Sequence, residues 1–207
     1  MLTAFEAFKR LQEGNRRFVA NQTTAEPIDR AHRAALAAGQ EPFAIILGCS
    51  DSRVPAELVF DQGFGDLFVI RVAGNIVAPS QVGSVEFAAS RFGTRLVVVL
   101  GHSGCGAITA TLEEITGQAT SQSRNLRSIV DRVRPSVETL LSDRRDHDPE
   151  TLIRDAVRAN VRASVNHLRN GSALLEHLSR SAGLKVLGAE YSLETGVVTF
   201  LDSLVAD

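Results

Sequence analysis

Three short, uninterrupted apolar segments limit most strongly what this chain can fold into: residues 43–47, 67–70 and 96–100. Continuous apolar runs of this length are typical of strands that are buried on both faces of a parallel sheet. The segments that separate them, 56–61 and 80–92, have the pattern of helices. This alternation predicts βαβ units and therefore an α/β fold.

The N-terminal segment has the pattern of an amphipathic helix. Thr3 and Glu6 have the spacing of a capping box, in which two side chains satisfy backbone N–H groups at a helix start. Apolar residues then recur at helical spacing and predict a helix over residues 3–20: Phe5, Phe8, Leu11 and Phe18. A shorter Ala-rich stretch, residues 32–38, is also predicted to be helical.

The second half of the chain is predicted to be mostly helical, with helices over 105–117, 124–141, 149–170 and 172–182. Pro135 interrupts the second of these, and we expect it to kink or split that helix.

The boundaries of the later elements carry their own signals. Asp148 before Pro149 is typical of an N-cap followed by proline at the first helical position. Gly183 stands where a C-terminal glycine cap is expected. Residues 185–191 and 197–201 flank a turn and predict a hairpin at one edge of the sheet.

These elements predict an α/β fold with a central, mostly parallel β-sheet flanked by helices, an N-terminal helical arm and a C-terminal edge hairpin. The 207 residues contain no segment that resembles a linker, so one domain over residues 1–207 is expected. Within it we distinguish the helical arm (1–40), the βαβ core with the candidate site (41–120), and the helices and strands that follow (121–207).

Composition excludes several classes of partner. A net charge of −2 gives no reason to expect binding to nucleic acid or to an anionic membrane surface. No apolar run approaches the roughly 18 residues that a membrane span needs. Residues 1–12 mix charged and apolar side chains and do not resemble a signal peptide, so a cytoplasmic location is predicted. Two cysteines are too few for a disulfide scaffold.

Both cysteines follow predicted strands. Cys49 comes directly after the first apolar run, and His102 and Cys105 follow the third. Ligand sites in parallel α/β sheets form at the carboxyl ends of strands. Two thiols and one imidazole suit zinc, and three protein ligands leave a fourth position open, as in catalytic rather than structural zinc sites.

Other interpretations of these residues remain open. Either cysteine taken singly is more simply a small core residue, and a disulfide between Cys49 and Cys105 is possible in an oxidising compartment. The glycine-rich segment 101–106 could suggest a phosphate-binding loop or a nucleophile elbow. Its spacing matches neither the dinucleotide and P-loop motifs nor the elbow, which would need glycine at position 105.

Asp51 and Arg53 lie two residues apart, so their side chains point to the same side of an extended segment. A surface ion pair of this kind usually contributes little to stability. Beside a metal ligand, however, the carboxylate can accept a hydrogen bond from zinc-bound hydroxide while the guanidinium holds it in place.

Two motifs, Cys-Ser-Asp-Ser-Arg-Val-Pro at 49–55 and Gly-His-Ser-Gly-Cys-Gly at 101–106, closely resemble the paired signatures of the β-class carbonic anhydrases. Segments 65–71, 73–75 and 84–88 are also similar to that family. The resemblance therefore extends over nearly the whole chain.

The resemblance implies reversible hydration of carbon dioxide to bicarbonate and a proton by attack of zinc-bound hydroxide. Cys49, His102 and Cys105 would bind one Zn²⁺ per chain, and Asp51 and Arg53 would orient the hydroxide. Closed forms in the family use the aspartate as fourth zinc ligand, and the choice between Asp51 and water stays open here.

Three further residues would bind substrate by the same resemblance. Gln40 is similar to a glutamine that, in one branch of the family, reaches across a dimer interface to hydrogen-bond bicarbonate. Phe68 and Phe87 would line an apolar pocket for carbon dioxide. An ordinary loop position for Gln40 and plain core positions for the phenylalanines are the alternatives.

The sequence departs from the family pattern at three positions. Phe87 stands where many relatives have tyrosine, and Val72 where asparagine is usual. Ile46 replaces a tryptophan that contributes to a noncatalytic bicarbonate site in another branch, so that regulatory pocket is predicted to be absent or altered.

The family fold implies a homodimer or homotetramer, in which the N-terminal helix packs on a neighbouring subunit. The apolar stripe of this helix fits that role, but it equally fits packing of the helix on the sheet of its own chain. Hydrolysis of carbonyl sulfide or carbon disulfide is an alternative activity. A non-catalytic zinc protein is the third hypothesis, and it predicts loss of a ligand or of the Asp51–Arg53 pair, all of which are present.

Overall fold

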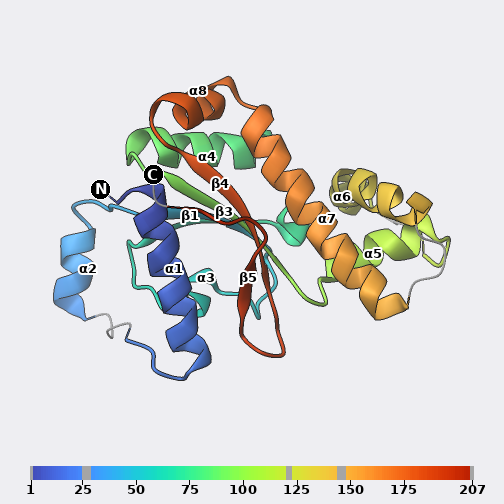
Figure 1. Cartoon of the computed structure of the whole chain (residues 1–207), viewed down its shortest axis with the longest axis horizontal. Coiled ribbons are helices and arrows are strands. Elements are labelled where there is room, and N and C mark those ends of the chain that lie inside the picture. Colours follow the sequence, from blue (N-terminus) through green and yellow to red (C-terminus); the bar gives the residue numbers. More distant parts are fainter. Residues whose placement is uncertain (1, 25–28, 120–122, 144–147, 206–207) are drawn as a thin grey trace.

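A computed structural model describes residues 2–24, 29–119, 123–143 and 148–205 of the chain (Figure 1). Its centre is a five-stranded sheet in the order β2-β1-β3-β4-β5. The first four strands are parallel, and β5 pairs antiparallel with β4 at the edge. The predicted α/β fold, with a mostly parallel sheet and a C-terminal edge hairpin, is confirmed. The strands are β1 (Ala44–Gly48), β2 (Leu67–Arg71), β3 (Leu96–His102), β4 (Lys185–Tyr191) and β5 (Val198–Phe200).

Strands β1 and β3 form the middle of the sheet, and every residue in them is buried. This explains why both segments are apolar at successive positions rather than at alternate ones, since neither face meets water. The two faces are covered by helices that lie far apart in the sequence (Figure 1).

One face of the sheet carries α1 (Ala4–Val19) and α3 (Ala56–Val59), and the other carries α4 (Pro79–Arg91), α7 (Pro149–Asn170) and α8 (Ala173–Ser181). Beyond the carboxyl ends of the strands, α5 (Gly106–Ile115) and α6 (Arg124–Asp143) pack with α7. A short α2 (Arg30–Leu36) buries no residue, and a single 3₁₀ turn, η1 (Ala73–Asn75), follows β2.

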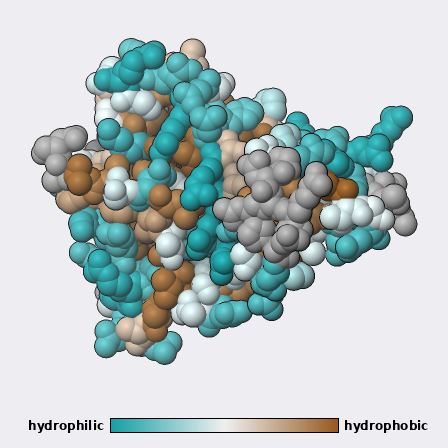
Figure 2. Space-filling view, turned by 45° about the vertical axis from the view of Figure 1, so that its right-hand side comes forward, coloured by the Kyte–Doolittle hydropathy of each residue, from teal (hydrophilic) through white to brown (hydrophobic). Residues whose placement is uncertain are grey.

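The outer face seen in Figure 2 mixes hydrophilic side chains with apolar ones. No helix in the described ranges is both long and apolar enough to cross a bilayer.

Helix α1 begins with the predicted capping box. The Thr3 hydroxyl accepts a hydrogen bond from the Glu6 N–H, and the Glu6 carboxylate accepts one from the Thr3 N–H. Phe8 and Leu11 are buried in the chain's own core, and the ring centroids of Phe8 and Phe200 lie 4.8 Å apart. For these two residues, packing on the chain's own sheet is therefore the explanation of the apolar stripe.

Helix α6 runs without interruption from Arg124 to Asp143, so the predicted split at Pro135 is wrong. Proline removes one backbone hydrogen bond, but Val133 and Val137 on the same helix are fully buried. Burial of this apolar face against α5 and α7 outweighs the lost bond.

Two other predicted boundary signals, Asp148 and Gly183, are confirmed. The Asp148 carboxylate accepts a hydrogen bond from the Thr151 N–H at the start of α7. Gly183 follows α8 with φ at +70°, a conformation that favours glycine.

Asn15 connects three elements through its buried side chain. Its Nδ2 donates to the carbonyls of Val59 and Gly196, and its Oδ1 accepts from the Val198 N–H at 2.8 Å. The amide therefore joins α1 to the end of α3 and to the β4–β5 hairpin.

We expect Asn15→Ala to lower the free energy of unfolding by about 3 kcal/mol, because it leaves buried backbone groups without partners. Denaturant unfolding measures the change. Glu13→Ala, on the exposed side of the same helix, is the control and should change stability by less than about 0.5 kcal/mol. Equal stability of the two variants would contradict the connecting role of Asn15.

Candidate metal centre

The register between β1 and β3 brings the two sequence motifs together. Gly48 lies opposite Leu100, so Cys49 leaves the sheet beside the end of β3, where His102 lies. A tight turn with Gly104 at φ +62° then returns the chain, and Cys105 becomes the N-cap residue of α5.

The ligand atoms of Cys49, His102 and Cys105 all lie within 4.8 Å of one another, and all three residues are buried. Both cysteines are free thiols, so the disulfide interpretation is wrong. Two sulfur atoms and one imidazole nitrogen converge on one point at the carboxyl edge of the sheet, as the sequence predicts.

The His102 ring has one nitrogen engaged and one free. Its Nδ1 lies 2.9 Å from the Ser103 carbonyl oxygen, to which only an N–H can donate. Nε2 is then the unprotonated nitrogen, and it is buried without a hydrogen-bond partner in the described part of the chain. A lone pair in such a place is costly unless a ligand uses it, and a metal ion beside two sulfur atoms fits the donor set.

The pKa values of the two thiols are shifted in opposite directions. A hydrogen bond from the Cys105 thiol lowers the pKa of Cys49, and hydrogen bonds from backbone N–H groups act in the same direction. The pKa of Cys105 is raised because its proton is donated to Cys49 and because the thiol is buried. Without metal, Cys49 is therefore the first of the two thiols to ionise.

Arg71 and Gly74 hold Cys49 in place, and neither residue belongs to the two motifs at 49–55 and 101–106. Arg71, at the end of β2, donates from Nε to the carbonyl of Cys49 at 3.0 Å and from Nη2 to the carbonyl of Asp51. The Gly74 N–H donates to Cys49 Sγ, with N and S 3.4 Å apart. Their only sequence signal is their position in the family-like segments 65–71 and 73–75.

Asp51 and Arg53 form the expected pair. Arg53 Nε lies 2.9 Å from Asp51 Oδ1, and Arg53 Nη2 lies 2.8 Å from Oδ2. These hydrogen bonds hold the pKa of the Asp51 carboxyl well below its usual range. Asp51 Oδ2 is 3.8 Å from His102 Nε2, so the carboxylate borders the metal-binding group while Arg53 engages both of its oxygens.

A hollow of about 470 Å³ is lined by Gly106 and Ala107, which follow Cys105 in the chain. The rest of its lining is mostly apolar and includes two carboxylates: Ala73, Ala110, Glu113, Glu114, Ala119, Leu126, Ile129 and Val130. None of the three metal-binding residues lines it.

The comparisons with known proteins agree with this geometry. Residues 44–198 match the model of a family described as carbonic anhydrase. Carbonic anhydrase 2 of Mycobacterium tuberculosis is 40% identical over 200 residues, which cover 96% of this chain and 93% of that protein. The chain belongs to the β-carbonic anhydrase family.

Structural neighbours show the same fold. The β-carbonic anhydrase CafA of Aspergillus fumigatus superposes with a TM-score of 0.75 at 24% identity, covering 96% of this chain and 92% of that one. The β-carbonic anhydrase CcaA gives a TM-score of 0.71 at 28% identity, with 94% and 95% covered. The enzyme is thus a carbonic anhydrase in sequence and in fold, with a Cys/His/Cys group that can bind a metal ion.

The remaining predicted site residues of this β-carbonic anhydrase lie elsewhere in the single chain. Phe68 is opposite Ile45 in the sheet, four residues before Cys49, or roughly 13 Å along the strand. Its ring packs with those of Phe87 and Phe92, and Phe87 is 54% exposed. Gln40 is exposed in the loop between α2 and β1. None of these residues lines the apolar hollow.

We expect metal-free protein to hold one thiolate per chain at pH 7, because the pKa of Cys49 is lowered while that of Cys105 is raised. The thiolate should become protonated only when the pH falls well below the pKa of an ordinary thiol. Ultraviolet absorbance of the thiolate, followed against pH, measures this. Cys49→Ser should remove the band at neutral pH, and a wild-type protein without a thiolate at pH 7 would contradict the proton sharing.

Proposed function

We propose that this enzyme binds one Zn²⁺ through Cys49, His102 and Cys105 and catalyses the reversible hydration of carbon dioxide to bicarbonate and a proton. The observation that carries the proposal is the buried, unpartnered Nε2 of His102 facing two sulfur atoms. Family membership supports the reaction, and the donor set supports the metal. When bound, zinc supplies Lewis acidity that makes hydroxide available from water near neutral pH.

Asp51 orients the nucleophile. Its pKa is held low by Arg53, so it stays ionised at neutral pH and can only accept hydrogen bonds. An ionised acceptor beside the metal-binding group would receive the hydrogen of a hydroxyl and leave the oxygen lone pair directed at carbon dioxide.

Arg53 holds the carboxylate through two parallel hydrogen bonds, which fix its orientation as well as its charge. This arrangement favours Asp51 as an orienting group over Asp51 as the fourth metal ligand.

We infer that carbon dioxide approaches by way of the mostly apolar hollow beside Gly106. Besides Glu113 and Glu114, the hollow is lined by glycine, alanine and aliphatic side chains, which suit an uncharged, apolar gas better than the bicarbonate anion.

We place Gln40, Phe68 and Phe87 in the active site of a neighbouring subunit, in a homodimer or homotetramer. In one chain they lie away from the metal-binding group, and Phe87, Phe64 and Leu58 are each more than half exposed. Exposed aromatic residues such as Phe64 and Phe87 are enriched at protein–protein interfaces. The β-carbonic anhydrases of Sordaria macrospora, which share this fold at 24% identity, are described as tetrameric.

The metal ligands also favour one location. Cys49 and Cys105 have to stay reduced to bind zinc, so a reducing compartment such as the cytoplasm suits the site.

Stopped-flow hydration of carbon dioxide by zinc-loaded protein tests the proposal directly. We expect Cys105→Ser to lose zinc and activity together, because one of three ligands is gone. Asp51→Ala should keep its zinc and lose about 100-fold in kcat, since it removes orientation but no ligand. Glu13→Ala, far from the site, is the control. Hydration by the wild type no faster than buffer between pH 7 and 9 would overturn the function.

Phe87→Glu tests the subunit arrangement. A charge in the aromatic cluster should shift the protein toward a monomer of 22.3 kDa in light scattering and lower activity at the same time. Leu174→Glu, at a partly exposed leucine of α8, is the matched control and should leave the mass unchanged. A wild-type monomer with full activity would contradict the arrangement.

A further inference from the structure

The turn of residues 73–75 touches the metal-binding group through a backbone hydrogen bond. The Gly74 N–H donates to Cys49 Sγ in a buried environment. Hydrogen bonds to a thiolate draw charge from the sulfur and tune the metal that it binds. Residues that fix the position of the Gly74 amide therefore influence the Cys49 sulfur and, through it, a bound metal ion.

The conformation of this turn is costly by itself. Gly74 has φ +69° and Asn75 has φ +44°, so two successive residues are left-handed and the second has a side chain. The Asn75 Nδ2 is also buried and unpartnered within the described ranges. Such a turn persists only where its surroundings hold it.

Two buried side chains of α7 provide that hold. Asn160 Nδ2 donates to the carbonyl of Gly74 at 2.8 Å, and Ser164 Oγ donates to the carbonyl of Asn75 at 3.1 Å. The two residues are four positions apart and therefore lie on one face of the helix. They are only 2% and 5% exposed. Each carbonyl of the left-handed pair thus has its own donor.

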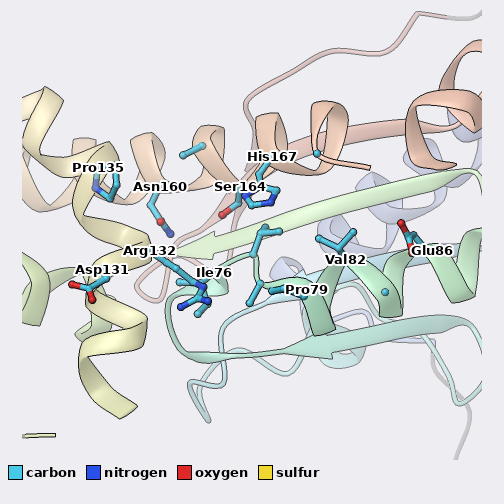
Figure 3. A pocket seen from close by; sticks show the side chains of 15 residues that line it. Ile76, Pro79, Val82, Glu86, Asp131, Arg132, Pro135, Asn160, Ser164 and His167 are labelled. Carbon is cyan, nitrogen blue, oxygen red and sulfur yellow. The ribbon is translucent and has the colours of Figure 1, made fainter. Parts of the chain in front are cut away.

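The close-up of the neighbouring pocket shows how these side chains lie. In Figure 3, Asn160 and Ser164 project from α7 toward the segment that carries Ile76, directly after the turn. A Cβ at position 74 would come within 3.1 Å of the Ala107 Cβ on α5. The turn therefore contacts both α7 and the helix that begins after Cys105.

We propose that Asn160 and Ser164 are positioning residues that fix the Gly74 amide on the Cys49 sulfur and thereby set the electron density of that metal ligand. The inference rests on the proposed function, because it takes Cys49 to be a metal ligand. Neither residue touches the metal-binding group, and both act through the turn. The zinc signature motifs at 49–55 and 101–106 contain neither residue.

Cobalt substitution gives a readout that a purely structural role would not move. Co²⁺ bound to thiolates shows a sulfur-to-metal charge-transfer band. We expect Asn160→Ala and Ser164→Ala to shift this band to lower energy, because a sulfur without its hydrogen bond gives up electrons more easily. Metal affinity should fall by about tenfold. Ser164→Ala removes only one hydroxyl group, so it still provides the test if Asn160→Ala does not fold.

The matched control is Val165→Ala, a truncation of a buried residue on the same helix that packs in the core between α7 and the sheet and not on the turn. It should lower the melting temperature without moving the band. Unshifted bands in both Asn160→Ala and Ser164→Ala, beside a normal wild-type band, would overturn the positioning role alone. A wild-type protein without a thiolate–cobalt band would overturn the proposed metal ligands themselves.

Discussion

Gly48 of β1 lies opposite Leu100 of β3, and this parallel register determines where both cysteines can be. Because the two strands run the same way, their carboxyl ends meet at one edge, and Cys49 and His102 leave the sheet side by side. A slip of one residue would turn every side chain of a strand to the other face. Burial of both strands on both faces makes such a slip expensive, so the core of the sheet maintains the geometry of the metal centre.

The burial that secures the sheet also defines the chemistry of the site. His102 is fully buried, and its Nδ1 is engaged by the Ser103 carbonyl, which leaves Nε2 facing the two sulfur atoms. Hydrogen bonds from Cys105 and from backbone N–H groups stabilise negative charge on Cys49. Arg53 does the same for Asp51 at the outer rim. The same few contacts therefore stabilise the fold and determine the protonation of the site residues.

Much of the fold follows from sequence, because its signals are local. Continuous apolar runs predicted the parallel strands, and the capping residues Thr3 and Asp148 predicted helix starts that the structure confirms. The predicted split at Pro135 does not occur, because the cost of proline is local while the burial of Val133 and Val137 depends on helices distant in the sequence.

The site, like the fold, has some residues that local sequence signals predict and others that depend on contacts distant in the sequence. Adjacent strand ends could be anticipated from the βαβ order, so Cys49, His102 and Cys105 were recognisable. The supports from Arg71, Asn160 and Ser164 depend on contacts across 20 to 89 positions of the chain, to which no local pattern points. The roles of Gln40, Phe68 and Phe87 depend on a second subunit and remain predictions.

Zinc X-ray absorption of the purified enzyme tests the proposed metal ligands directly, because it identifies the ligand atoms without reference to activity. We predict two sulfur ligands at about 2.3 Å and two nitrogen or oxygen ligands at about 2.0–2.1 Å, one of them from His102. Replacement of Cys49 or Cys105 by serine should remove one sulfur shell or the zinc itself. A zinc ion surrounded only by nitrogen and oxygen in the wild-type protein would contradict the account.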